Sequence, residues 1–237
     1  MQNADTATAV RRKREPVYGA FAGPVAGFGV MEAPKPSSER ASGAPGENRP
    51  ATAGTGGKPV VVALIGLPGA GKSVVARALT DQLGLRRVCR DTIRHAMFPA
   101  CSYSFAEKRA AFRAVMLALE INCMLGESSV IDGVTFSRRR DLERVDAVIR
   151  HYDFTAIPVF LECPPHVAHG RIAAEIEHNR HVARDRTPEL VYEVQARFDT
   201  PPANALVVDA TQPAAEVCRI IVDAVARIRS GVGAVVT

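Results

Sequence analysis

Residues 66–73, which read GLPGAGKS, fit the pattern G-x-x-x-x-G-K-[ST] at every fixed position. Glycines let a loop turn its backbone amides toward one anion, and the following helix adds the positive end of its dipole. A lysine here reaches the β- and γ-phosphates, and a serine hydroxyl ligates Mg²⁺. A glycine turn with this spacing can arise by chance, but an apolar run precedes this one and a helical pattern follows it. We expect a site for ATP and Mg²⁺. The predicted nucleotide-binding residues are Gly66, Leu67, Pro68, Gly69, Ala70, Gly71, Lys72, Ser73 and Val74.

A carboxylate at the end of another apolar run completes the predicted metal site. Asp132 follows the run 129–131, so Ser73 and Asp132 are expected to hold Mg²⁺. The next residue is Gly133, where motor-type ATPases commonly use a glutamate to activate water, and no N/T-K-x-D motif for reading guanine occurs. These absences argue against a motor ATPase and a GTPase.

A second carboxylate suggests a phosphoryl acceptor. Asp91 directly follows a weaker predicted strand over 87–90, and Arg94 lies one helical turn further. The carboxyl ends of parallel strands share one edge of the sheet, where ligands bind. There, Asp91 could take the proton of an attacking hydroxyl, and Arg94 could hold an anionic group of the substrate. Alternatively, or in addition, Asp91 is the N-cap of a short helix over 92–96.

The hydrophobic pattern alternates between strands and helices from residue 58 onward. Expected strands cover 59–65, 87–90, 129–132, 156–161 and 205–208. Expected helices run from the glycine loop to 83, over 104–124 behind the capping-box pair Ser104 and Glu107, over 139–151, from 165, over 187–198 and over 213–228. This order predicts an α/β three-layer sandwich around a five-stranded parallel sheet.

The N-terminal quarter of the chain has a different composition. The 237 residues include 18 Gly and 16 Pro, and residues 1–57 hold 15 of these 34 without any apolar periodicity. We expect a disordered leader over 1–57 and one NTP-binding domain over 58–237. The basic run 11–14 could be a nuclear signal or a nucleic-acid contact, although a solvated tail is the simpler interpretation. Five separate cysteines, without a C-x-x-C pair, indicate reduced thiols and a cytoplasmic protein.

The glycine loop, the segments RDTIR and VIDGVTFSRRR, and the arginine-rich stretch 180–186 together resemble P-loop kinases of the AAA-type, zeta toxin-like and polynucleotide 5′-hydroxyl kinase group. The resemblance covers residues 58–237. It implies the strand order 2-3-1-4-5, with Asp91 as general base, Arg94 as a substrate contact and Asp132 near both metal and substrate. Arg139 would belong to a basic patch that contacts the substrate. The sequence Gly-Val-Thr at 133–135 departs from the D-x-T-N-like signature of many relatives.

The resemblance also implies a lid over the triphosphate. Its catalytic arginines would be Arg180 and Arg184, with Arg186 as a third candidate, although a solvated charged loop is the alternative. The pairs His166/His169 and His178/His181 are expected to be surface histidines, because no cysteine or acidic cluster accompanies them.

Two function classes follow. The first is an ATP-dependent kinase, with Lys72, Asp91 and the lid arginines as catalytic residues, acting on a hydroxyl of a small molecule or of a nucleotide or polynucleotide end. A net charge of +5 and 5% aromatic residues give a nucleic-acid substrate little support. The second is a regulatory ATPase or adaptor with slow hydrolysis. No apolar run is long enough to span a membrane.

Overall fold

The computed structural model describes residues 57–177 and 187–231, and the predicted leader therefore lies outside the described residues except for Gly57. The described elements are β1 (Val60–Ile65), α1 (Lys72–Leu83), β2 (Arg86–Cys89), α2 (Arg90–Met97), α3 (Phe105–Met124), β3 (Ser129–Asp132), α4 (Arg139–Ile149), β4 (Thr155–Glu162), α5 (Pro165–Glu177), α6 (Leu190–Gln195), β5 (Leu206–Asp209) and α7 (Ala214–Ser230). None of the helices in these two ranges is long and apolar enough to cross a membrane.

The five strands form one sheet in the order β2-β3-β1-β4-β5, and every pair is parallel. This confirms both the predicted fold class and the predicted strand order. The central strand β1 is buried along its whole length. An all-apolar run of this kind suits a strand that is covered on both faces.

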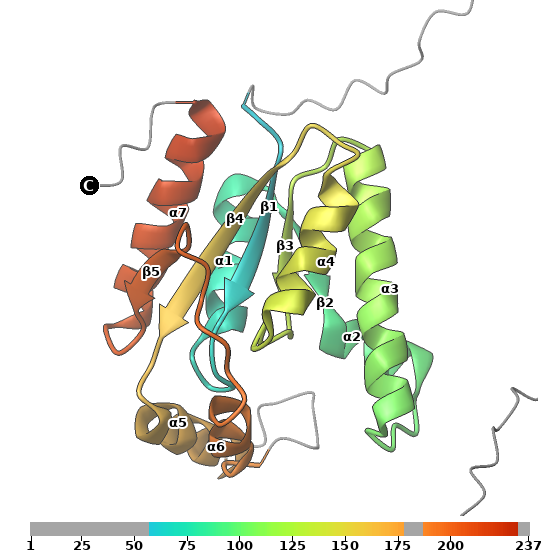
Figure 1. Ribbon diagram of the computed structural model, residues 1–237. Coiled ribbons are helices and arrows are strands. Elements are labelled where there is room, and N and C mark those ends of the chain that lie inside the picture. Colours follow the sequence, from blue (N-terminus) through green and yellow to red (C-terminus); the bar gives the residue numbers. More distant parts are fainter. Residues whose placement is uncertain (1–56, 178–186, 232–237) are drawn as a thin grey trace, which may run out of the picture. The chain divides into compact units, whose positions relative to one another are not determined.

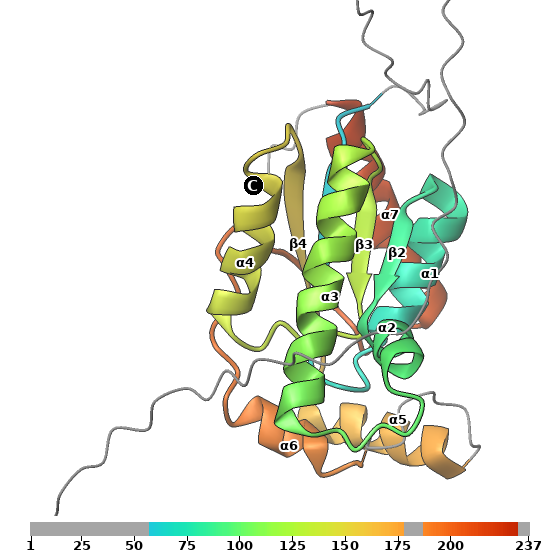
Figure 2. The same ribbon diagram turned by 90° about the vertical axis from the view of Figure 1, so that its right-hand side faces the viewer.

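Helices cover the two faces of the sheet (Figures 1 and 2). Alternate residues of β1 enter two separate cores: Val60, Val62 and Leu64 pack with residues of α1 and α7, whereas Val61 and Ala63 pack with residues of α3 and α4. This alternation follows from the two-residue period of a strand. The result is the three-layer sandwich.

The site-bearing edge of the sheet is the one toward which the strands run. In Figure 1 the arrowheads of β1 and β4 point toward α5 and α6, and the turn between β1 and α1 lies at this end. The first residues after β2 and β3 emerge at the same edge, because these strands are parallel to β1. Residues that are far apart in the sequence therefore meet beyond the carboxyl ends of the strands.

The boundaries of the elements agree with the sequence patterns except at two helices. The capping box predicted at the start of α3 is present, with Ser104 Oγ accepting from the amide of Glu107 and the Glu107 carboxylate accepting from the amide of Ser104. The helix expected over 187–198 is shorter, since Leu190 and Phe198 donate to carbonyls three residues back, as in 3₁₀ turns. The short helix expected over 92–96 begins earlier, at Arg90.

Candidate active site

The turn between β1 and α1 depends on three glycines with positive φ. These angles are 151° at Gly66, 82° at Gly69 and 93° at Gly71, a region that other residues rarely adopt. Gly69 also has no room for a side chain, because a Cβ there would lie 2.4 Å from the carbonyl oxygen of Ala168 in α5. The loop is therefore in direct backbone contact with α5, and it leads into the N-terminus of α1, which favours an anion.

Lys72 is folded back onto the loop that precedes it. Its Nζ donates hydrogen bonds to the carbonyl oxygens of Gly66 at 2.8 Å and Leu67 at 2.7 Å, and the residue is 7% exposed. The ammonium group is thus held beside the same loop whose amides would face a phosphate. The motif predicts that this ammonium group reaches the β- and γ-phosphates, and that contact stays a prediction.

Ser73 and Asp132 meet as the sequence predicted. Ser73 Oγ donates to Asp132 Oδ1 at 3.0 Å, although the two residues are 59 positions apart. The amide of Gly133 donates to the same oxygen at 2.7 Å, and the Asp132 side chain is 1% exposed. A hydroxyl and a carboxylate placed side by side are hard oxygen ligands, so they fit Mg²⁺, which binds through few protein oxygens and retains several waters.

Arg87 in β2 is a partner of Asp132 that sequence reasoning missed. Arg87 Nε donates to Asp132 Oδ2 at 2.9 Å, and a terminal guanidinium nitrogen donates to the same oxygen. Burial opposes ionisation of Asp132, but the hydrogen bonds from Arg87, Ser73 and Gly133 outweigh it and lower the pKa of Asp132 below its usual value. Cys89 lies opposite Asp132 in the register of β2 with β3. Arg87 lies two residues before Cys89, so its side chain is on the same face of the sheet as that of Asp132. The contact between Arg87 and Asp132 can therefore be predicted only once the register of β2 with β3 is known.

Asp91 lies in the first turn of α2 rather than at its N-cap, a position that Cys89 occupies. The N-cap interpretation of Asp91 is therefore wrong. Arg94 donates to Asp91 Oδ1 at 3.0 Å, and a terminal nitrogen of Arg90 lies 3.6 Å from the same oxygen. The side chain of Arg94 is 4% exposed, and its guanidinium stacks 4.5 Å from the ring centroid of Tyr103.

The other oxygen of Asp91 lies beside the loop that follows β3. A Cβ on Gly133 would lie 3.2 Å from Asp91 Oδ2, and Gly133 has a φ of 74°. A side chain at Gly133 would therefore crowd that carboxylate oxygen. The same loop is tied to the nucleotide loop, because the amide of Gly66 donates to the carbonyl of Thr135 at 3.1 Å. The next residue, Phe136, is buried with a φ of 48°, a strained conformation for a residue with a large side chain.

Not every predicted site residue comes to this place. Arg139 begins α4, where its backbone amide donates to Asp199 Oδ2 at 2.9 Å, and it does not line the cavity described below. The hydrogen bond from this amide and that from the Arg138 side chain lower the pKa of Asp199. The lid candidates Arg180, Arg184 and Arg186 lie outside the described residues.

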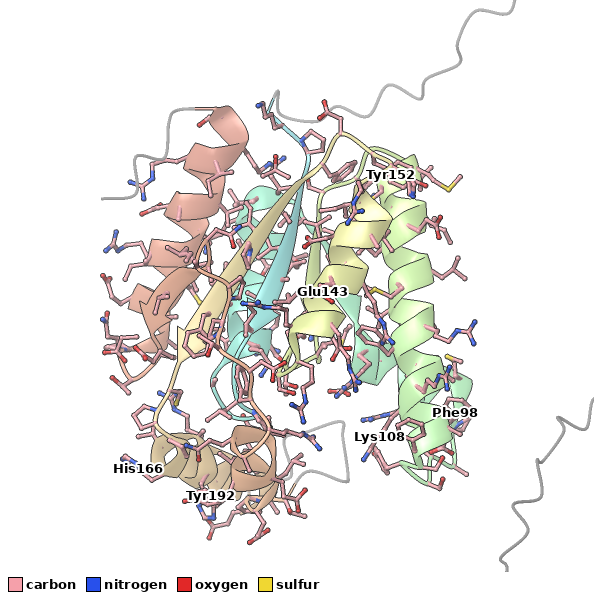
Figure 3. All side chains as sticks on the ribbon, in the orientation of Figure 1. Phe98, Lys108, Glu143, Tyr152, His166 and Tyr192 are labelled. Atoms are coloured by element: carbon pink, nitrogen blue, oxygen red, sulfur yellow. The ribbon has the colours of Figure 1, made fainter. Side chains whose placement is uncertain are left out.

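A cavity of about 650 Å³ joins these groups. It extends from the nucleotide loop across Asp132 to α2, α3 and α6, and most of its described polar lining is charged. The basic residues that line it are Lys72, Arg77, Arg87, Arg90, Arg94, Lys108 and Arg197, and the acidic ones are Asp91, Asp132 and Glu175. Figure 3 labels Lys108 near the start of α3. Among the described lining residues positive charge exceeds negative charge by four, which suits an anionic ligand.

A second cavity, of about 380 Å³, lies on the other side of the nucleotide loop. Its lining is mainly apolar and comes from α1, α5, α7 and the segment between β5 and α7. Val74, Val75, Val217 and Cys218 contribute apolar surface, and Arg171 is held at its edge by a hydrogen bond of 2.9 Å to the carbonyl of Ala210. An apolar cavity with few polar groups is the usual form of a site for a flat organic ring.

Histidines and cysteines form no metal site in the parts of the chain that the structure covers, where no group of three or more His, Cys, Asp or Glu side chains converges. His169 instead packs against Tyr192, with ring centroids 5.6 Å apart and the ring planes tilted by 45°, and Figure 3 labels its helical neighbour His166 on α5. All five cysteines are free thiols, as their spacing predicted.

Comparison with known proteins gives a family and a fold. The model of a family described as an AAA domain matches residues 61–201, which is more than half of the chain. None of the curated proteins matches this sequence significantly.

Several solved kinase structures share the fold at low sequence identity. A gluconokinase from Sinorhizobium meliloti 1021 superimposes with a TM-score of 0.55 at 18% identity, covering 73% of this chain and 95% of that one. The APS kinase CysC of Mycobacterium tuberculosis, in complex with AMPPNP and APS, superimposes with a TM-score of 0.54 at 17% identity, covering 72% of this chain and 99% of that one. A sugar kinase from Janibacter sp. HTCC2649 superimposes with a TM-score of 0.53 at 17% identity, covering 70% of this chain and 93% of that one. These likenesses establish the P-loop kinase-like fold.

Proposed function

This chain belongs to the AAA domain family, and on that basis we propose that it is an ATP-dependent kinase which phosphorylates a hydroxyl group of a small molecule. One observation carries the proposal: the carboxylate of Asp91 lines the same cavity as Lys72 and Ser73 of the nucleotide loop. A protein that only binds nucleotide has no need of a second carboxylate there, and Gly133 occupies the position at which motor-type ATPases carry their water-activating glutamate. A kinase needs one to receive the acceptor's proton.

We place ATP across the nucleotide loop. The amides of the loop and Lys72 would bind the β- and γ-phosphates, and the cavity beside Val75 and Val217 would take the base. The two cavities share Gly69, Gly71, Val74 and Glu175, so a single nucleotide can reach both. Mg²⁺ would be held by Ser73 and Asp132 and would neutralise charge on the phosphates.

In the proposed reaction the oxygen of the acceptor hydroxyl attacks the γ-phosphorus in line with the leaving ADP. A bond forms between that oxygen and phosphorus, and the bond from phosphorus to the β–γ bridging oxygen breaks, its electron pair leaving with ADP. The hydroxyl proton passes to Asp91, and from there to water. Asp91 Oδ2 suits this role because Arg94 and Arg90 engage the other oxygen and fix the orientation of the carboxylate. Holding the groups in this geometry supplies most of the rate.

The test is ADP production from Mg·ATP by the wild type, Asp91→Asn and Asp146→Asn. Asp146 is an exposed carboxylate on α4, outside both cavities, and provides the matched control. Acceptors are sugars, hydroxy acids, nucleosides, 5′-hydroxyl oligonucleotides and hydroxylated antibiotics. We expect one class to stimulate ADP production, and Asp91→Asn to lower that rate about 100- to 10,000-fold without changing ATP affinity.

A regulatory ATPase would behave differently in the same assay. Its slow hydrolysis would be indifferent to every acceptor, and Asp91→Asn would match Asp146→Asn. That result would remove the general-base assignment and the kinase proposal together.

The finer predictions from the sequence enter this proposal as further tests. Membership of the zeta toxin-like or polynucleotide kinase branch would appear as activity on nucleotide or oligonucleotide acceptors. Removal of residues 1–57 should leave phosphoryl transfer intact if 58–237 form the catalytic unit. Arg180→Ala and Arg184→Ala should lower transfer if these arginines stabilise the transition state. The five free thiols support a cytoplasmic location.

A further inference from the structure

We propose that two copies of this chain associate through the outer face of α3, each α3 helix packing antiparallel against the same helix of the other copy. This outer face is the solvent-exposed side of α3 and its C-cap, and its residues are Arg113, Leu117, Glu120, Ile121, Met124 and Leu125. None of them lines either of the cavities described above, so the inference goes beyond the proposed function and does not depend on it.

The outer face exposes a cluster of large apolar side chains. Four of them, each between 47% and 68% exposed, are Leu117, Ile121, Met124 and Leu125. They make up four of the ten large apolar residues that are exposed in the described part of the chain, and they lie within nine consecutive positions. The opposite side of α3 already buries Ala111, Val115, Leu119 and Cys123. A helix that is apolar on both sides is normally covered on both sides.

No helix or strand among the described residues covers this face. Figure 2 looks onto α3, which lies in front of the sheet, and no other labelled element lies over its near side. Beneath, α3 packs against α2, α4, β2 and β3. The four apolar side chains expose about 400 Å² in total, a size at which a surface patch often marks an interaction site. A partner that covers the face must match its charges as well as its apolar residues.

The charges of α3 are arranged so that a second copy fits. Arg113 and Glu120 lie seven residues apart, about two helical turns, with Leu117 between them on the same face. Within the ranges that the structure describes, neither of the two charged residues forms a salt bridge. When two α3 helices lie antiparallel with the two-fold axis beside Leu117, Arg113 comes level with the partner's Glu120. Symmetry forms this pair twice.

The uncharged residues of the face match in size in the same arrangement. Ala110 lies one turn before Arg113 on the same side of the helix, and it comes level with the partner's Met124. A small residue opposite a large one allows two helices to approach closely. The contact would bury about 600 Å² per chain, somewhat less than the roughly 800 Å² of a standard interface, which predicts a reversible dimer of micromolar affinity. An unrelated partner would have to reproduce this pattern of charge and size, whereas a second copy supplies it by symmetry.

The first measurement is sedimentation velocity of the full chain at concentrations from about 1 to about 200 µM, which bracket micromolar affinity. We expect a reversible equilibrium between monomer and dimer with a Kd of about 10 µM. A chain that stays monomeric at every concentration would overturn the proposal and leave the outer face to a different partner.

Two exposed isoleucines provide a matched pair of variants. Ile121 on the outer face is 47% exposed, and Ile176 on α5 is 49% exposed. Ile121→Asp should weaken dimerisation at least about 30-fold, because two carboxylates would be buried in the interface without partners. Ile176→Asp should leave the Kd of the dimer unchanged, and circular dichroism should show that both variants are folded. Equal effects of the two substitutions on Kd would overturn an interface at α3.

Charge reversal tests the antiparallel arrangement. Arg113→Glu and Glu120→Arg should each weaken dimerisation about tenfold, because each substitution places two pairs of like charges across the interface. The double variant Arg113→Glu/Glu120→Arg re-forms both pairs with their signs exchanged, and it should dimerise within about threefold of the wild type. A double variant that dimerises no more tightly than the single variants would refute the pairing of Arg113 with the partner's Glu120, and with it the proposed arrangement.

Discussion

Two neighbouring arginines in β2 provide a sharp test of how the site is stabilised. Arg86 pairs with Glu127 and Arg87 pairs with Asp132, each through two nitrogens of one guanidinium. The first pair is largely exposed, with side-chain exposures of 63% and 21%, whereas in the second pair Asp132 is 1% exposed. Replacing either arginine with glutamine removes one charge from the same strand, so the two variants differ mainly in the burial of the remaining carboxylate.

The expected magnitudes follow from that difference. Removing one member of a fully buried ion pair costs about 3–5 kcal/mol, because a buried charge is left without its partner. Arg87 is 31% exposed, so water can replace part of its interaction, and we expect Arg87→Gln to lower the free energy of unfolding by about 2–3 kcal/mol. Arg86→Gln should change it less, since the Glu127 carboxylate is partly accessible to water, which can replace the lost hydrogen bonds.

Urea denaturation of the full chain, followed by circular dichroism, measures both variants. The double variant Arg87→Gln/Asp132→Asn should lose less stability than the sum of its single variants, because no buried charge remains. Activity adds a second readout: Arg87→Gln should raise the Mg²⁺ concentration needed for half-maximal ADP production, as Asp132 loses the group that orients it. Equal loss of stability in Arg86→Gln and Arg87→Gln would refute the burial argument.

Two further predictions concern the same edge of the sheet. The pKa of Asp132 is lower in the folded chain than in the unfolded one. The ionised carboxylate therefore stabilises the fold above the unfolded-state pKa of about 3.9, and this contribution is lost as the pH falls further. In urea titrations, the difference in the free energy of unfolding between wild type and Asp132→Asn should shrink from about pH 6 to pH 3. Gly69→Ala should cost at least about 3 kcal/mol and abolish ATP binding, because its Cβ meets the carbonyl of Ala168, whereas Gly84→Ala, also at positive φ but in open space, should cost about 1 kcal/mol and leave ATP binding unchanged. Similar losses in the two glycine variants would contradict the close contact between the loop and α5.

The local features of this protein are determined by short stretches of its sequence. The glycine spacing of 66–73 defines a phosphate-binding turn, because positive φ and the absence of Cβ are properties of single residues. The five strands follow from apolar runs and the start of α3 from a four-residue capping box, both of which are short-range signals. The pairing of Ser73 with Asp132 was also predictable, since in a parallel sheet both follow strands at one edge.

Only the tertiary structure decided which charges share the cavity. Arg87 contacts Asp132 because β2 and β3 pair in one particular register, and a shift of one residue would have turned Arg87 to the opposite face. Arg139, which the family resemblance placed at the substrate, lies outside the cavity because the start of α4 is tied to Asp199. Lys108 and Arg197 carried no sequence signal, yet they line the same cavity as Asp91 and Lys72. Side-chain neighbours of this kind depend on packing between elements tens of residues apart, which local patterns do not encode.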